Sequence, residues 1–187
     1  MLEKFILLPH LPEIPDNLVD QILINDNDYI NYGSFGDGVG RNISKNGQQM
    51  PSSSNRIRDA SDMLKHWITQ NITRHWANAG TVITDAGKSV VGPHIDRIRN
   101  YSLLYPIVTG GNNVTTVFYR LKDPKKSRAE FFYNDISELE EIARVRIPQN
   151  TWCILDTKTI HAVEGLDSTR VTVQVGLWDY VGLPDVQ

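Results

Sequence analysis

The sequence predicts a mainly β protein, in which an antiparallel sandwich or jelly roll follows N-terminal helices that pack on one side of it. After residue 80, short runs of β-branched and aromatic residues alternate with turn residues, and no long helical pattern intervenes. Before residue 80, apolar residues recur at helical intervals instead. At 187 residues we expect a single domain, 1–187, with a helical and loop part at 1–80 and a jelly-roll core at 81–187.

Composition and charge narrow the function. A hydrophobic fraction of 40% and a charged fraction of 22% are typical of a globular protein. The net charge of -3 leaves no excess of cations for neutralising phosphates, which disfavours nucleic acid as a partner. The single cysteine, Cys153, lies in an apolar run, where we expect a buried thiol in a reducing compartment. The apolar run at 5–8 is too short for a signal peptide or a membrane span, so we expect a cytoplasmic protein without a membrane partner.

Two helices are predicted in the N-terminal part. The segment 14–23 has Pro15 in its first turn, a position that tolerates proline. The segment 59–79 has apolar residues at three- and four-residue spacing, which predicts an amphipathic helix of about five turns that ends at Gly80. His66 and His75 lie on this helix, and we expect structural or surface roles for both.

The segment 32–55, between these helices, is rich in Gly, Ser and Asn and keeps neither helical nor strand periodicity. Long loops of this kind are typical of linkers or of covers over a site. We therefore take 32–55 as a candidate lid.

The C-terminal part contains short candidate strands that are separated by clear turn residues, such as Thr109-Gly110-Gly111 and Gly165. The candidate strands are 81–85, 89–95, 101–108, 114–120, 130–133, 143–147, 151–156, 161–163 and 170–178. Strands of this length without long helices between them favour the jelly roll.

Two of these strands carry residues suited to metal binding. His94 and Asp96 stand two apart at the end of a predicted strand, where alternate side chains project to the same face and can bind one ion. A His-x-Asp triplet alone is a weak signal, because it arises often by chance. A later strand region supplies His161, and Arg170 follows nine residues further on, with Thr172 two beyond it.

This order of residues resembles the Fe(II)/2-oxoglutarate-dependent dioxygenase superfamily, and the resemblance covers 90–178, about half of the chain. His161-x-Val163 is similar to the His-x-Val of many prolyl-hydroxylase-like members. Arg170-x-Thr172 resembles the Arg-x-Ser pair that holds the co-substrate in others, whereas collagen-type prolyl hydroxylases generally use Lys at the position of Arg170. The resemblance identifies no subfamily.

The resemblance implies a double-stranded β-helix that holds Fe(II) through the catalytic triad His94, Asp96 and His161. Two imidazoles and one carboxylate leave three coordination positions, two for 2-oxoglutarate and one for dioxygen. A carboxylate at Asp96 favours hydroxylation over halogenation, since halogenating relatives have a small residue there. Arg170, with the Thr172 hydroxyl beside it, suits the distal carboxylate of 2-oxoglutarate.

Further residues near the motif have open roles. Family members often place a co-substrate-binding Tyr on the following strand, so Tyr105 and Tyr101 are cofactor-binding candidates, with ordinary packing as an equal alternative. Arg97 and Arg99 alternate relative to His94 in a way that favours the outer face, where we expect them to be solvated; steering of an anionic substrate is the alternative.

The expected function is an oxygenase that hydroxylates a C–H bond of an amino-acid, peptidyl or small-molecule substrate and releases succinate and CO2. One alternative is a catalytically silent jelly-roll module that binds a small ligand or peptide. Another is a cupin-like metalloenzyme without 2-oxoglutarate, which would normally gather more His ligands. The sequence leaves the substrate and the oligomeric state open.

Overall fold

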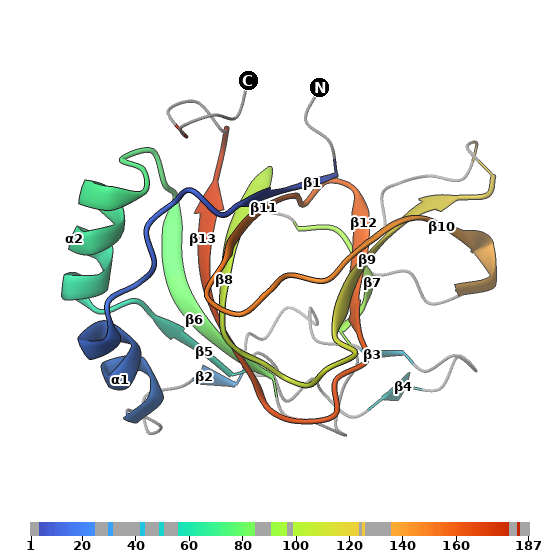
Figure 1. Cartoon of the computed structure of the whole chain (residues 1–187). Helices are drawn as coiled ribbons and strands as arrows, with labels where there is room; N and C mark the ends of the chain where they lie inside the picture. Colours follow the sequence, from blue (N-terminus) through green and yellow to red (C-terminus); the bar gives the residue numbers. More distant parts are fainter. Residues whose placement is uncertain are drawn as a thin grey trace.

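The computed structural model describes residues 4–24, 30–31, 42–43, 49–50, 56–84, 91–96, 99–123, 125, 136–179 and 183. Within them, two antiparallel sheets face each other, and two helices lie against the outer side of the larger sheet (Figure 1). This is the sandwich of a jelly roll with helices on one side. No helix of the described part is long and apolar enough to cross a membrane.

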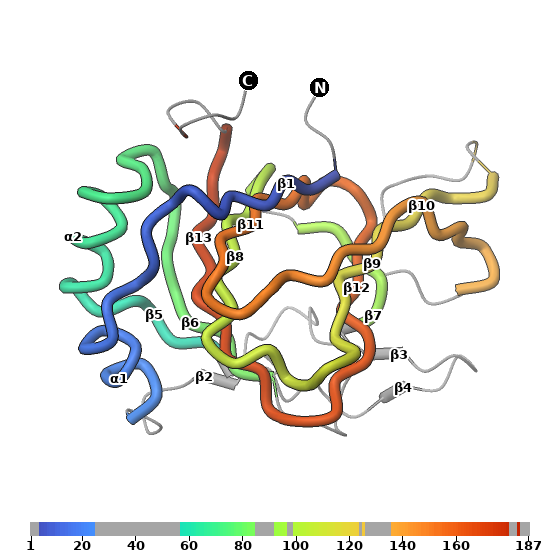
Figure 2. The backbone as a smooth tube through the Cα atoms, in the orientation of Figure 1, coloured from blue at the N-terminus to red at the C-terminus, as the bar shows by residue number. Residues whose placement is uncertain are grey.

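The larger sheet has seven strands in the order β1-β11-β8-β13-β6-β5-β2. Their bounds are β1 Phe5–Leu8, β2 Ile30–Asn31, β5 Arg56–Asp59, β6 Asn78–Thr84, β8 Tyr101–Thr109, β11 Trp152–Asp156 and β13 Arg170–Leu177. The N-terminal strand β1 pairs with β11 from the far end of the sequence, as the chain trace shows (Figure 2). The N-terminal strand therefore forms one edge of this sheet, beside a strand from the C-terminal part of the chain.

The smaller sheet has four strands in the order β10-β9-β12-β7. Their bounds are β7 Val91–His94, β9 Thr115–Leu121, β10 Leu139–Val145 and β12 Ile160–Glu164, and a 3-10 helix, Ile136–Glu138, precedes β10. A separate pair joins β3 (Asn42–Ile43) to β4 (Gln49–Met50). The neighbouring strands β12 and β7 each carry one histidine of the predicted metal site.

Alternation of side chains builds one core on each face of the larger sheet. On β13, the side chains of Val171, Val173 and Val175 pack into the cluster beneath the helices. Residues of the opposite face, such as Leu104 of β8 and Cys153 of β11, meet Phe118 of the smaller sheet between the two sheets. The period of two therefore sends every second residue of these strands into the space between the sheets.

Helix α1 (Asp16–Ile24) and helix α2 (Asp62–Asn71) bury their apolar sides against the larger sheet. The side chain of Ser61 caps α2, where its Oγ accepts a hydrogen bond from the Leu64 amide at 3.2 Å. Leu64 and Ile68 then point into the core. The expected helix 14–23 thus corresponds to α1.

The predicted five-turn helix at 59–79 is wrong in length, because α2 ends at Asn71 and Gly80 lies within strand β6. Trp76 still packs against α2 through a hydrogen bond from its Nε1 to Thr69 Oγ1 at 3.1 Å. Its apolar position therefore continued the helical spacing although its backbone is not helical. His66 and His75 are both exposed, in accord with the surface role expected for them.

The predicted strands are confirmed wherever the structure describes them, with shifts of a few residues. The expected strand 130–133 and Arg97 lie outside the described residues. So does the candidate lid 32–55, apart from the two short strands β3 and β4. Strands β1 and β5 were not anticipated: the residues of β1 form only a short apolar run in the sequence, and Asp59 of β5 falls at the start of the predicted helix.

Candidate metal centre

The two histidines of the predicted triad lie opposite each other on neighbouring strands. His94 ends β7, and His161 of β12 is its direct partner in the antiparallel register. Directly opposed residues project to the same face of a sheet, and the ring centroids are accordingly 4.4 Å apart. The His161 ring also lies 6.3 Å from Phe118, which places the pair on the side that faces the larger sheet.

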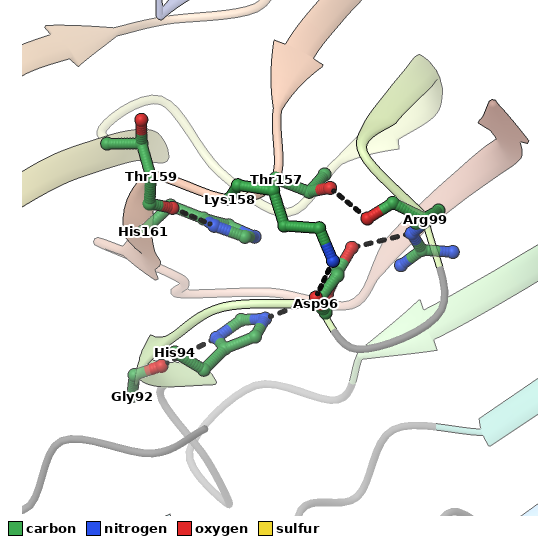
Figure 3. A network of polar contacts seen from close by, with 8 residues as sticks. All are labelled: Gly92, His94, Asp96, Arg99, Thr157, Lys158, Thr159 and His161. Atoms are coloured by element: carbon green, nitrogen blue, oxygen red, sulfur yellow. Dashed lines mark hydrogen bonds and ion pairs between the residues drawn. The ribbon is translucent and has the colours of Figure 1, made fainter. Parts of the chain in front are cut away.

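Asp96 completes the cluster from the segment that follows β7 (Figure 3). One ligand atom from each of His94, Asp96 and His161 can be chosen so that all lie within 4.8 Å of one another. Within the described part of the chain, this is the one group of three or more His, Cys, Asp or Glu residues that could share an ion. The structure thus brings together the three residues that the sequence grouped only by their order and spacing.

Backbone carbonyls fix the orientation of both rings. His94 Nδ1 lies 2.8 Å from the carbonyl oxygen of Gly92, and His161 Nδ1 lies 2.9 Å from that of Thr159. Because a carbonyl only accepts hydrogen bonds, each Nδ1 carries the proton and each Nε2 presents a lone pair. This is the arrangement that metal-binding histidines use.

Electrostatics keep the ligands in their metal-binding forms. Burial and the neighbouring His161 lower the pKa of His94 to about 4, so its imidazole is neutral at physiological pH. Burial by itself raises the pKa of Asp96, but the charge and the hydrogen bond of Arg99 hold that pKa below its usual value. The site therefore offers neutral imidazole and an ionised carboxylate.

Arg99 is not solvated on the outer face, as the alternation had suggested. Its Nε donates to Asp96 Oδ2 at 2.5 Å, and its side chain is only 14% exposed. The chain leaves strand geometry after His94, so the alternation no longer applies there. The one sequence signal for this pair is the three-residue spacing of opposite charges.

The turn between β11 and β12 holds the Asp96 segment. The Asp96 amide donates to the carbonyl oxygen of Thr157 at 3.0 Å, and Lys158 Nζ donates to the Asp96 carbonyl oxygen at 2.8 Å. These contacts join residues about sixty apart in sequence, and local spacing could not have identified them. Asp96 is thus fixed through both its backbone and its side chain.

Arg170 lies buried at the start of β13 and lines a pocket between the sheets together with Thr109, Thr116 and Arg146. Its Nε donates to Thr172 Oγ1 at 3.1 Å, as the Arg-x-Thr spacing suggested. Burial lowers the pKa of Arg170 to about 10. Across the described residues, no carboxylate pairs with this guanidinium, and a buried cation of this kind is suited to an anionic ligand.

The pocket and the histidines share one face of the smaller sheet. Phe118 of β9 is the register partner of His161, and Thr116, which lines the pocket, stands two residues along the same strand. Two residues of a strand span about 7 Å. The donor set, two imidazoles and one carboxylate, fits a non-heme Fe(II) ion, and the buried Arg170 fits a carboxylate of a ligand beside it.

Tyr105 and Tyr101 lie on the other face of the larger sheet. Tyr105 is buried beneath the helices, where its ring packs 4.9 Å from Trp152 and its hydroxyl accepts from the Ile14 amide at 3.3 Å. Tyr101 packs against the same cluster. The strand alternation therefore turns both rings away from Arg170, and their expected contact with the co-substrate is corrected to a packing role.

No protein-family model and no curated protein matches this sequence. A prolyl hydroxylase from Trichoplax adhaerens, solved with a peptide fragment of the hypoxia inducible factor oxygen degradation domain, has TM-score 0.54 and 10% identity over 94% of this chain and 84% of its own. A Pseudomonas putida prolyl-4-hydroxylase has TM-score 0.52 and 12% identity, covering 93% and 92%. The non-heme α-ketoglutarate-dependent epimerase SnoN of nogalamycin biosynthesis has TM-score 0.53 and 10% identity, covering 92% and 77%. These likenesses show that the chain shares its fold with these enzymes.

Proposed function

We propose that this chain is an Fe(II)- and 2-oxoglutarate-dependent oxygenase built on the double-stranded β-helix of the superfamily that its sequence resembles. The observation that carries the proposal is a pair of features on one inner face. His94, Asp96 and His161 converge within 4.8 Å, and a buried arginine without a carboxylate partner in the described structure lines the adjacent pocket. A catalytically silent binding module would need the pocket but not the triad.

The triad residues would hold the iron. The Nε2 lone pairs of His94 and His161 are directed by their Nδ1 contacts, and Asp96 adds one negative charge. Three protein ligands leave three coordination positions for other molecules. Bound iron would let dioxygen oxidise 2-oxoglutarate and the substrate together: one oxygen atom would enter succinate as CO2 is lost, and the other would convert a C–H bond into an alcohol.

Arg170 and Thr172 would bind the distal carboxylate of 2-oxoglutarate. The guanidinium already donates through Nε to Thr172 Oγ1, which leaves its terminal N–H groups for an anion. Because Thr172 Oγ1 accepts that bond, its own proton is free to be donated to the same carboxylate. The exposed Arg146, at the edge of this pocket, adds positive charge that favours a dianionic co-substrate.

Substrates of two kinds are compatible with this proposal. One structural neighbour was solved with a peptide fragment and another is an epimerase of nogalamycin biosynthesis, so the fold serves enzymes of peptides and of small molecules. We propose an amino-acid, peptidyl or small-molecule substrate that is hydroxylated with dioxygen. The net charge of -3 argues against nucleic acid.

The test is anaerobic addition of Fe(II) and then 2-oxoglutarate to the metal-free protein. We expect a visible charge-transfer band that appears only when both are present, because only a keto acid chelated to iron absorbs there. Asp96→Ala should abolish the band. A wild-type protein that binds Fe(II) but shows no band would contradict the use of 2-oxoglutarate and favour a metal or binding module without it.

A further inference from the structure

The side chain of Arg99 packs beside Gly176, near the end of strand β13 in the larger sheet. A Cβ atom added to Gly176 of β13 would collide with Asn78 Oδ1 and lie 3.1 Å from Arg99 Cδ, so the glycine leaves room for both side chains. The backbone of Arg99 is tied to the turn that precedes β12, because Thr157 Oγ1 donates to the Arg99 carbonyl oxygen at 3.1 Å. Figure 3 shows the Thr157 contact beside the ion pair between Arg99 and Asp96, so both the backbone and the side chain of Arg99 are held in place.

From this place Arg99 gives the two oxygens of Asp96 different surroundings. Oδ2 accepts the hydrogen bond from Arg99 Nε at 2.5 Å. Oδ1 faces the other way, 3.6 Å from His94 Nε2, which is the ring nitrogen that carries the lone pair. Oδ1 is therefore the Asp96 oxygen beside the lone pair of His94.

We propose that Arg99 is a positioning residue that restricts Asp96 to one metal-binding oxygen, Oδ1. This inference rests on the proposed function and explains a requirement of it. If both oxygens bound the ion, the triad would fill four of six positions and leave two. A chelating keto acid and dioxygen together need three. Arg99 keeps the third position open by occupying Oδ2.

The test compares Arg99→Met, which removes the charge and the donor, with Arg99→Lys, which restores the charge without the planar fork. Co(II) serves as the probe, with its affinity measured by calorimetry and its coordination read from the visible absorption spectrum, both without 2-oxoglutarate. Arg120→Met is the matched control, because Arg120 Nε makes the same kind of bond to Glu140 Oε2, at 2.8 Å, between two exposed side chains of the smaller sheet.

We expect Arg99→Met to weaken Co(II) binding about 10- to 100-fold, the range typical of residues that orient metal ligands. Its Co(II) spectrum should change, and Arg99→Lys should recover part of both. Arg120→Met should behave as wild type, and equal midpoints of thermal unfolding would show that the variants fold.

The outcomes separate this inference from the proposed function. Wild-type affinity and spectrum in Arg99→Met would overturn the role of Arg99 and leave the metal centre intact. Changes of equal size in Arg120→Met would also overturn it, because the effect would then follow from charge alone. A wild-type protein that binds neither Co(II) nor Fe(II) would overturn both proposals.

Discussion

Burial sets the protonation state of His94 in the candidate site. His94 lies between the sheets beside a second imidazole, and these surroundings lower its pKa to about 4. Its Nδ1 proton is held by the Gly92 carbonyl, so the remaining lone pair is available without competition from protons near neutral pH. The fold thus prepares this ligand before any metal binds.

A pH dependence of stability follows from this pKa. The folded value lies below the unfolded value of 6.5, so the unfolded chain binds the proton more readily between pH 4 and 6.5, and stability falls as the pH is lowered through that window. Through His94 alone, the metal-free protein should be about 2 kcal/mol less stable at pH 5 than at pH 7. Urea unfolding of wild type and His94→Asn measures this, and the same pH dependence in both proteins would contradict it.

Arg170 carries the second prediction at this scale. A carboxylate in a partly desolvated pocket needs a paired cation, so Arg170→Ala should weaken 2-oxoglutarate binding by about 2–5 kcal/mol, roughly 30-fold to several thousand-fold. Co(II) affinity should stay near wild type, since Arg170 lies on β13 and outside the triad. Arg170→Lys should recover only part of the loss. If calorimetry showed unchanged 2-oxoglutarate affinity in Arg170→Ala, another residue would have to bind the distal carboxylate.

At the scale of elements, the turn between β12 and β13 sets the spacing of His161 and Arg170. Gly165 in this turn has φ +77°, and a Cβ atom there would lie 2.2 Å from the Asn113 carbonyl oxygen. A side chain therefore meets both backbone strain and a collision with backbone. The backbone conformation of this turn therefore requires glycine at position 165.

Gly165→Ala should accordingly lower the free energy of unfolding by about 1–3 kcal/mol, the range typical of a strained left-handed residue. Gly92→Ala is the control, because its Cβ would have nothing within 4 Å. Equilibrium unfolding in urea compares the two variants. Equal stability of Gly165→Ala and Gly92→Ala would show that the turn relaxes without cost.

The strands could be predicted because their signals are local, whereas the three candidate ligands were identified by a resemblance that spans 90–178. Period-two alternation and turn residues mark β8 to β13, and a fixed order of residue types marks His94, Asp96 and His161. The end of α2 could not be predicted, because Trp76 stands at a helical spacing in the sequence although its backbone is not helical. Its side chain reaches α2 through a hydrogen bond to Thr69 instead. The faces of Tyr101 and Tyr105, and the pairing of Arg99, depend on tertiary packing that no spacing encodes.

At the scale of the whole molecule, the candidate site joins strands of both sheets. His94 and His161 come from the smaller sheet, whereas Arg170 comes from the larger one. The turn between β11 and β12 holds the segment that carries Asp96. A ligand bound by all of these groups requires the sandwich to be closed. Its binding should therefore stabilise the whole fold.

Metal addition and removal test this linkage. Co(II) at about 100 times its dissociation constant should stabilise the protein by about 2.7 kcal/mol, which raises the thermal midpoint by roughly 5–10 °C for a chain of this length. A chelator should reverse the change. In Asp96→Ala the midpoint should be insensitive to Co(II), and a rise equal to that of wild type would place the metal elsewhere.

The most direct test of the central claim is a crystal structure of the anaerobic complex with Fe(II) and 2-oxoglutarate, in which anomalous scattering at the iron edge locates the metal. We predict one iron bonded to His94 Nε2, Asp96 Oδ1 and His161 Nε2, with the distal carboxylate of 2-oxoglutarate paired with Arg170 and Thr172. Iron bound at other residues, or 2-oxoglutarate absent from the Arg170 pocket at saturating concentration, would contradict the assignment.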